Sequence, residues 1–227
     1  MIKACVFDLD GTLLDTLPAI RYFVNVFMEK YGLLSIDLQK TAAFVGDGAV
    51  KLIERAIENS GVEINSPRGR ELFSDIHPEY VREYNDDPFF MTDAYDGIKS
   101  ALASLKASGI KLAVLSNKPH DTVVQLARKY FPDTFSEVAG AKDAVPLKPA
   151  PDGALDICRR LGVQPSEVAY FGDTGVDMKT AAAFGAGAAV GVLWGFRGRD
   201  ELIADGATVL LAHPSEIYGL ICGGKYE

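Results

Sequence analysis

Cysteine, histidine and tryptophan are scarce in this chain of 227 residues, which contains three, three and one of them. The odd number and wide spacing of the cysteines argue against a disulfide framework and for reduced thiols. The histidines show no metal-ligand spacing, so a zinc site built on histidine is not expected. We therefore expect a cytoplasmic protein in which Cys5, Cys158 and Cys222 are reduced and mostly buried.

The chain has fewer basic than acidic residues. It contains 23 lysines and arginines and 31 aspartates and glutamates, which gives a formal net charge of -8. Nucleic-acid binding is not expected, since it normally requires a basic stripe on the surface. Long apolar runs are also absent, and the short apolar segment at the amino terminus ends in acids. We therefore expect neither a signal peptide nor a membrane span, and no membrane partner.

The first dozen residues place two acids directly after an apolar segment. Ile2 to Phe7 predicts a buried strand, and Asp8 and Asp10 follow it. If the extended conformation continues, residues two apart point to the same side, so the two carboxylates converge. Their repulsion is tolerable only with a cation or a shared proton between them, which predicts a hard-metal site. The alternative is an ordinary polar turn, closed by Gly11.

The rest of the chain shows two different patterns. Residues 15–91 have helical periodicity without a strand pattern, which predicts a small inserted bundle of four helices. From residue 92 onward, helices alternate with short apolar strands. We therefore expect an α/β fold, in which residues 1–14 and 92–227 form a doubly wound parallel sheet with helices on both faces.

Four segments resemble the motifs of the haloacid dehalogenase-like hydrolases, in order and with ordinary spacing. They are Asp8-Leu9-Asp10-Gly11-Thr12, Leu115-Ser116-Asn117, Lys148-Pro149 and Gly172-Asp173-Thr174-Gly175-Val176-Asp177. Asp8, Ser116 and Asp173 each end a predicted strand, at the sheet edge where ligands of such folds bind. The resemblance covers nearly the whole chain. It implies a Rossmann-like catalytic core and makes the helical insertion a mobile cap domain.

The resemblance also implies a phosphatase and gives roles to the acids. Asp8 is the candidate nucleophile that forms an aspartyl-phosphate, while Asp10 is the general acid and afterwards the base. The metal ligands are expected to be Asp8, Asp10 and Asp173, with Mg2+ as the ion and the Asp10 backbone carbonyl also facing it. Asp177 either orients a metal-bound water or is simply an acid at a helix start.

The second and third motifs are expected to contact the phosphate. Ser116 offers a hydroxyl and Asn117 a backbone amide, although a Ser-Asn loop after a strand is common. Lys148 lies on a segment stiffened by prolines that could hold its ammonium against Asp8 and the phosphate; an exposed loop lysine is the alternative. Lys118 follows the second motif without a defined role.

The helical insertion is expected to determine the substrate. The loop with Gly46 and Gly48 resembles the cap loop of the phosphoglycolate phosphatase branch, where the two glycines would let the backbone approach a small anion. Relatives often carry Asn where this chain has Asp47, and the added negative charge works against an anion. Lys51 and Arg55 either restore positive charge or form a solvated helix face.

The sequence therefore predicts a magnesium-dependent phosphatase that hydrolyses a small phosphorylated metabolite, most similar to phosphoglycolate phosphatase, and that is a monomer or homodimer. A phosphohexose mutase similar to beta-phosphoglucomutase, and a pyrophosphatase or nucleotidase, are alternatives with the same fold. A non-catalytic phosphorylated switch is disfavoured by the paired acids of the first motif and by the large insertion.

Overall fold

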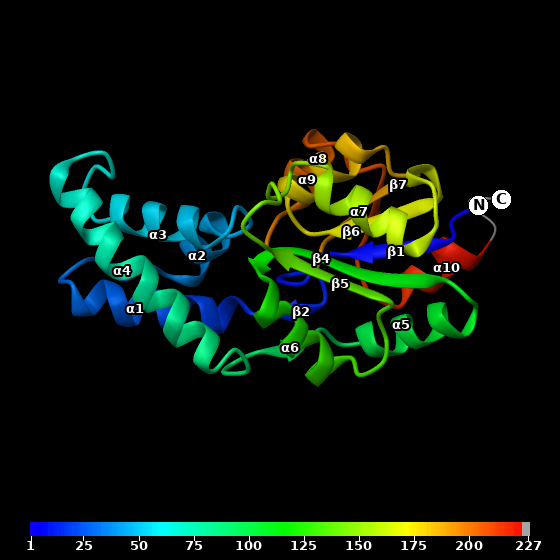
Figure 1. Ribbon diagram of the computed structural model, residues 1–227, viewed down its shortest axis with the longest axis horizontal. Helices are drawn as coiled ribbons and strands as arrows, with labels where there is room; N and C mark the ends of the chain where they lie inside the picture. Colours follow the sequence, from blue (N-terminus) through cyan, green and yellow to red (C-terminus); the bar gives the residue numbers. More distant parts are fainter. Residues whose placement is uncertain (224–227) are drawn as a thin grey trace. The chain divides into compact units, whose positions relative to one another are not determined.

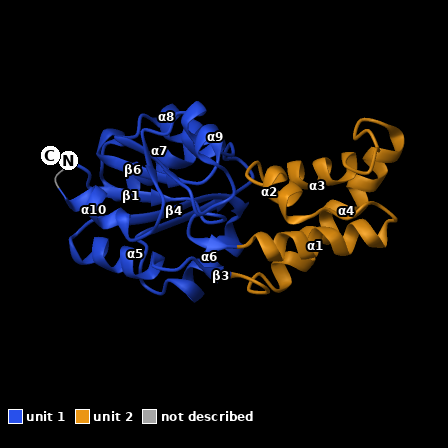
Figure 2. Cartoon of the chain, turned by 180° about the vertical axis from the view of Figure 1, so that it is seen from behind, with its two compact units in different colours: residues 1–15, 93–227 blue, residues 16–92 orange. Residues whose placement is uncertain are grey.

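The computed structural model describes residues 1–223 and divides the chain into two compact units (Figure 2). One unit consists of Met1–Asp15 together with the chain from Asp93 onward, and the other of Thr16–Thr92. Each join lies one residue beyond the boundary expected from the sequence. The function of the smaller unit as a cap stays a prediction.

The larger unit is built on a six-stranded sheet in the order β5-β4-β1-β6-β7-β8, and all of its neighbouring strands are parallel (Figure 1). The strands are β1 (Ala4–Phe7), β4 (Lys111–Pro119), β5 (Glu137–Ala141), β6 (Val168–Gly172), β7 (Ala188–Val192) and β8 (Val209–Leu211). This pairing confirms the predicted parallel sheet. Parallel neighbours need crossover connections, and helices supply them here.

Helices cover both faces of this sheet, which explains why the central strands are apolar throughout. One face carries α5 (Ile98–Ala107), α6 (His120–Tyr130) and α10 (Glu216–Cys222), and the other carries α7 (Asp152–Leu161), α8 (Gly175–Phe184) and α9 (Arg199–Ala204) (Figure 1). Every residue of β1 and of β6 is buried. The rings of Phe7 and Phe171 stack between these two strands at a centroid distance of 4.5 Å.

The strand order reverses direction at β1. From β1 the chain proceeds outward through β4 to β5, and it then returns to the other side of β1 to build β6, β7 and β8. At such a switch point the connections leave in opposite directions, so a crevice opens outside the carboxyl ends of the two central strands. The residues that follow β1 and β6, Asp8 and Asp173, lie at this crevice.

A second, two-stranded sheet has no counterpart in the sequence expectations. β2 (Leu14–Asp15) pairs antiparallel with β3 (Asp93–Ala94), so the two segments that join the larger unit to the insertion are held together. Two residues per strand are too few to produce a period-two pattern, which explains why the sequence did not indicate this pair.

The smaller unit contains the four expected helices, α1 (Leu17–Lys30), α2 (Leu38–Phe44), α3 (Ala49–Glu58) and α4 (Pro67–Asp86). Pro78 lies inside α4 without dividing it. Aromatic side chains pack α1 against α4, as the 5.3 Å separation of the Phe23 and Tyr84 rings shows. Among the described residues, no helix combines the length and the apolar character needed to cross a membrane.

Candidate active site

Asp8 stands where β1 ends, and the strand fixes its backbone. Its N–H donates to the carbonyl of Phe171 at 2.9 Å, which continues the β1–β6 ladder by one residue. The Leu9 N–H donates to Asp8 Oδ1 at 2.7 Å, and the residue is only 6% exposed. A buried carboxylate held in this way points into the crevice with little freedom to rotate.

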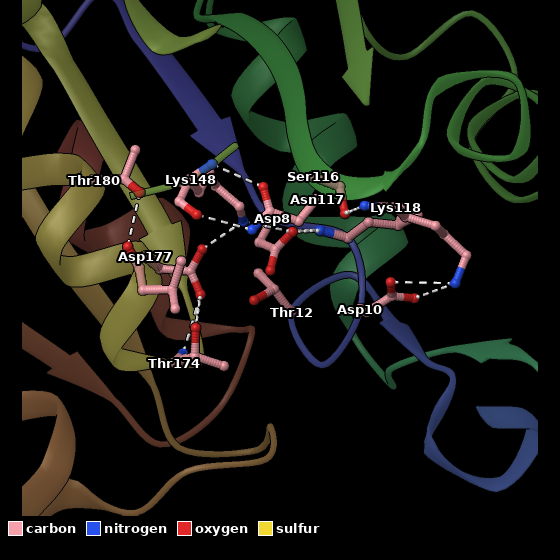
Figure 3. A network of polar contacts seen from close by, with 12 residues as sticks. Asp8, Asp10, Thr12, Ser116, Asn117, Lys118, Lys148, Thr174, Asp177 and Thr180 are labelled. Carbon is pink, nitrogen blue, oxygen red and sulfur yellow. Dashed lines mark hydrogen bonds and ion pairs between the residues drawn. The ribbon is translucent and has the colours of Figure 1, made fainter. Parts of the chain in front are cut away.

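Lys148 bridges two buried acids (Figure 3). Its Nζ lies 2.9 Å from Asp8 Oδ1 and 2.7 Å from Asp177 Oδ1, and its side chain is 3% exposed. The Asn117 side chain holds the lysine backbone, because its Oδ1 accepts from the Lys148 N–H at 2.8 Å and its Nδ2 donates to the Lys148 carbonyl at 3.0 Å. The structure therefore gives the Asn117 side chain a positioning contact that the sequence did not indicate.

Asp173 follows β6 and is completely buried. Its Oδ1 accepts from Thr12 Oγ1 at 3.0 Å, and its Oδ2 accepts from the Phe196 N–H at 2.8 Å. The backbone packs tightly around it, since a side chain added at Gly11 or Gly195 would overlap Asp173. Glycine is thus required at both positions for the two loops to reach this carboxylate.

Asp177 caps the start of a helix, which is one of the two alternatives that the sequence left open, and its orientation of a metal-bound water stays a prediction. Its Oδ2 accepts from the Thr174 N–H at 3.1 Å and from Thr174 Oγ1 at 2.7 Å, which caps the start of α8. Its Oδ1 faces Lys148, so the same carboxylate belongs to the crevice as well. The residue is fully buried, and Tyr170 Oη contributes a longer contact of 3.4 Å.

The acids of the crevice fit a hard cation. Carboxylate oxygens of Asp8, Asp173 and Asp177 lie within 4.8 Å of one another. Among the described residues, the ammonium of Lys148 contacts Asp8 and Asp177, so the three acids outnumber the cation that pairs with them and a divalent ion would balance the remaining charge. Oxygen-only donors of this kind suit Mg2+.

Asp10 turns its carboxylate toward Lys118 rather than toward that cluster. Lys118 Nζ lies 3.1 Å from Asp10 Oδ1 and 3.2 Å from Oδ2 (Figure 3). The pattern of two acids two residues apart could not show this contact, because a local pattern does not include a lysine 108 positions away. That the Asp10 backbone carbonyl faces a metal stays a prediction.

Ser116 and Lys118 lie where β4 becomes irregular. The pairing of β4 with β5 shifts register between Leu115 and Pro119, so these residues occupy a bulge at the carboxyl end of the strand. Ser116 is buried, and its Oγ accepts from the Lys118 N–H at 3.3 Å. The sequence predicted that the strand ends at Ser116, because an irregular extension carries no period-two signal.

The glycines expected to contact substrate, Gly46 and Gly48, belong to the smaller unit. Both have positive φ, and Gly48 is the residue before α3. Asp47 pairs with Arg55 at 2.6 Å, and Arg55 also donates to the Phe44 carbonyl at 2.7 Å. The arginine therefore compensates the charge of Asp47 within the loop itself. The substrate contacts of the glycines stay a prediction.

Burial dominates the protonation of the crevice acids. It raises the pKa of Asp8 to about 7, against the opposing charge of Lys148 and with the support of Asp177 and Asp10. Burial, with Asp177 and Asp8, also raises the pKa of Asp173 well above its usual value. Burial alone would lower the pKa of Lys148, but Asp177 and Asp8 hold it well above its usual value, so this lysine stays charged.

We expect Mg2+ binding to weaken as the pH falls below about 7, because protons then compete with the ion for Asp8 and its neighbours. The apparent dissociation constant should rise about ten-fold per pH unit for each proton displaced. Titration calorimetry at pH 6 and pH 8, in two buffers of different ionisation enthalpy, measures both the affinity and the protons released. An affinity that does not change with pH would contradict a site made of these acids.

Comparisons with known proteins identify the family of this chain. The family model of the haloacid dehalogenase-like hydrolases matches residues 2–185. The phosphoglycolate phosphatase of Chromobacterium violaceum is 32% identical over 98% of this chain and 98% of its own. The N-acetylmuramic acid 6-phosphate phosphatase of Pseudomonas aeruginosa is 29% identical over 97% and 95%.

A solved structure from Lactobacillus delbrueckii subsp. bulgaricus, provisionally described as a phosphoglycolate phosphatase, superposes with a TM-score of 0.89. It is 28% identical and covers 97% of this chain and 98% of its own. The family match spans the strands that end in Asp8 and Asp173, and it includes Lys148. This chain is therefore a member of the haloacid dehalogenase-like hydrolases.

Proposed function

We propose that the protein is a magnesium-dependent phosphatase that hydrolyses a small phosphate monoester, with phosphoglycolate as the leading candidate. The observation that carries the proposal is the buried Asp8 carboxylate, held by Lys148 beside two further buried acids. A nucleophile, a fixed positive charge and a cation site within one crevice are the parts that phosphoryl transfer requires.

Asp8 is the nucleophile in this proposal. The Leu9 N–H and Lys148 both contact Oδ1, so we assign the attack on phosphorus to Oδ2. The new bond joins Oδ2 to phosphorus while the ester P–O bond breaks, which gives an aspartyl-phosphate and an alkoxide. A Mg2+ ion held by Asp8, Asp173 and Asp177 would neutralise the charge of the phosphoryl oxygens.

Asp10 completes the reaction as acid and then as base. It donates a proton to the departing alkoxide, and the resulting carboxylate then takes a proton from the water that attacks phosphorus. Hydrolysis breaks the bond between phosphorus and Asp8 Oδ2 and regenerates the enzyme. The carboxylate of Asp10 lies outside the buried acid cluster, so proton transfer suits it better than side-chain metal ligation.

The other motif residues position the phosphoryl group. Lys148 offers a permanent positive charge, because its neighbours keep it protonated. Ser116, buried at the end of β4, offers its hydroxyl as a donor. The side chain of Asn117 maintains the lysine in place through two hydrogen bonds.

The substrate assignment has its support in the relatives, whose names include phosphoglycolate phosphatase and N-acetylmuramic acid 6-phosphate phosphatase. A phosphate-release assay with Mg2+ should therefore compare both compounds with hexose phosphates, nucleotides and pyrophosphate. We expect phosphoglycolate to give the highest kcat/KM and an excess of chelator to stop its hydrolysis. A hexose phosphate that is isomerised without release of phosphate would favour a mutase, and release in excess chelator would contradict the metal requirement.

A further inference from the structure

Lys118 is a charged residue of the crevice that the proposed reaction leaves without a function. Its side chain is 7% exposed, and its partner Asp10 is 20% exposed. The ammonium contacts both oxygens of the Asp10 carboxylate, at 3.1 and 3.2 Å. Such a weakly solvated charge interacts strongly with any neighbouring anion, because little water screens it.

Lys148 and Lys118 lie on different sides of Asp8. Lys148 faces the buried acid cluster through Asp8 and Asp177. The side chain of Lys118 extends away from Lys148 and ends at Asp10 (Figure 3). Lys118 therefore lies on the side of Asp10, the proton donor of the proposed reaction, and contacts this acid rather than the buried acid cluster.

The backbone of Lys118 is well fixed. Its N–H donates to Ser116 Oγ at 3.3 Å, and its carbonyl packs so closely on Gly140 of β5 that a side chain at Gly140 would overlap it. The pairing of β4 with β5 resumes at Pro119, directly after the lysine. A fixed backbone limits the positions that the ammonium can reach.

The position of the Lys118 ammonium limits how far from it the oxygen of the leaving group can lie. If Asp10 protonates the leaving oxygen, that oxygen lies within about 3 Å of an Asp10 oxygen. Asp10 Oδ1 is 3.1 Å from Lys118 Nζ, so the leaving oxygen lies within about 6 Å of the ammonium. Atoms two or three bonds beyond the ester oxygen can then contact Nζ directly.

We propose that Lys118 determines specificity by binding a carboxylate on the carbon that bears the ester oxygen, so that the preferred substrates are phosphate esters of 2-hydroxy acids. This inference rests on the proposed phosphatase function, and it names the substrate class of the same crevice. A carboxylate on this carbon forms a charge-assisted hydrogen bond with the Lys118 ammonium. A neutral, apolar substituent on the same carbon cannot form this bond.

A binding cycle with compounds that cannot be hydrolysed tests the proposal. 3-Phosphonopropionate carries the carboxylate and propylphosphonate lacks it, and both have a P–C bond in place of the ester. We expect the wild-type protein with Mg2+ to bind the carboxylate compound about ten- to hundred-fold more tightly by calorimetry. Lys118→Met should reduce this ratio to about three or less, while Lys118→Arg should restore part of it. An unchanged ratio in Lys118→Met would overturn the proposal.

Kinetics separate substrate recognition from an effect on Asp10. Phosphoglycolate and 2-hydroxyethyl phosphate differ in the carboxylate, and Lys118→Met should lower kcat/KM for the first at least about ten-fold more than for the second. Equal losses would show that Lys118 acts through Asp10 and would overturn the proposal. Lys142→Met, a change on an exposed loop, is the matched control and should keep the wild-type ratio.

The same measurements distinguish failure of the inference from failure of the proposed function. A wild-type protein that hydrolyses neither ester, nor any other phosphate monoester of the panel, contradicts the proposed function, and the binding cycle then still decides whether Lys118 recognises the carboxylate. A wild-type protein that hydrolyses both esters equally well, with no carboxylate preference in binding, contradicts the inference alone.

Discussion

Asp8→Asn is expected to lower kcat by a factor on the order of 10⁴ or more, because an amide cannot attack phosphorus as a carboxylate does. The fold should remain, since Lys148 keeps its contact with Asp177 at 2.7 Å and the Leu9 N–H can still donate to the amide oxygen. We expect the free energy of unfolding to change by less than about 2 kcal/mol. Phosphate release, acid-quenched trapping of the phosphoenzyme and urea unfolding measure the three quantities.

Asp200→Asn is the matched control for this substitution. Asp200 is exposed in the first turn of α9, in the same unit of the molecule but outside the crevice. It should leave turnover within about two-fold of the wild type, as expected for a surface substitution. Turnover by Asp8→Asn with a trapped phosphoenzyme would rule out Asp8 as the nucleophile.

Lys148→Met is expected to damage both activity and stability. Removal of the charge that the proposed reaction assigns to the phosphoryl group should lower kcat by about 10²–10³-fold. The change also leaves Asp8 and Asp177 without their buried cation, and breaking such a pair costs about 3–5 kcal/mol in the free energy of unfolding. Urea unfolding without divalent ions measures this loss, and Lys142→Met on the exposed loop is the control.

The loss of stability in Lys148→Met should depend on pH. Burial already raises the pKa of Asp8 to about 7, and removal of the opposing lysine raises it further. The folded variant then holds a proton on Asp8 at a pH above 7, where the wild type and the unfolded chain have released it, so the stability of the variant continues to fall as the pH rises beyond about 7. We expect a larger destabilisation at pH 8 than at pH 5, and the opposite order would contradict the assigned ion pair.

From the amino-acid sequence alone, the architecture and the sheet edge that carries the candidate site could be predicted. Apolar segments followed by polar residues predicted the strands that end near Asp8, Ser116 and Asp173, and the alternation with helices predicted that these ends share one edge. These features could be predicted because strand and helix periods are local. The carboxyl ends of parallel strands also all lie at the same edge of the sheet.

Which side chains meet at that edge became known from the folded chain and not from the sequence. The fold placed Asp177 in the acid cluster, used the side chain of Asn117 to hold Lys148, and paired Lys118 with Asp10. These contacts join positions as far apart as the 108 residues between Lys118 and Asp10, and the direction of each side chain depends on the bulge in β4 and on the loops around it. A local sequence pattern predicts whether a segment is a helix or a strand. The partner of a charged side chain depends instead on which distant residues the folded chain places within a few ångströms of it.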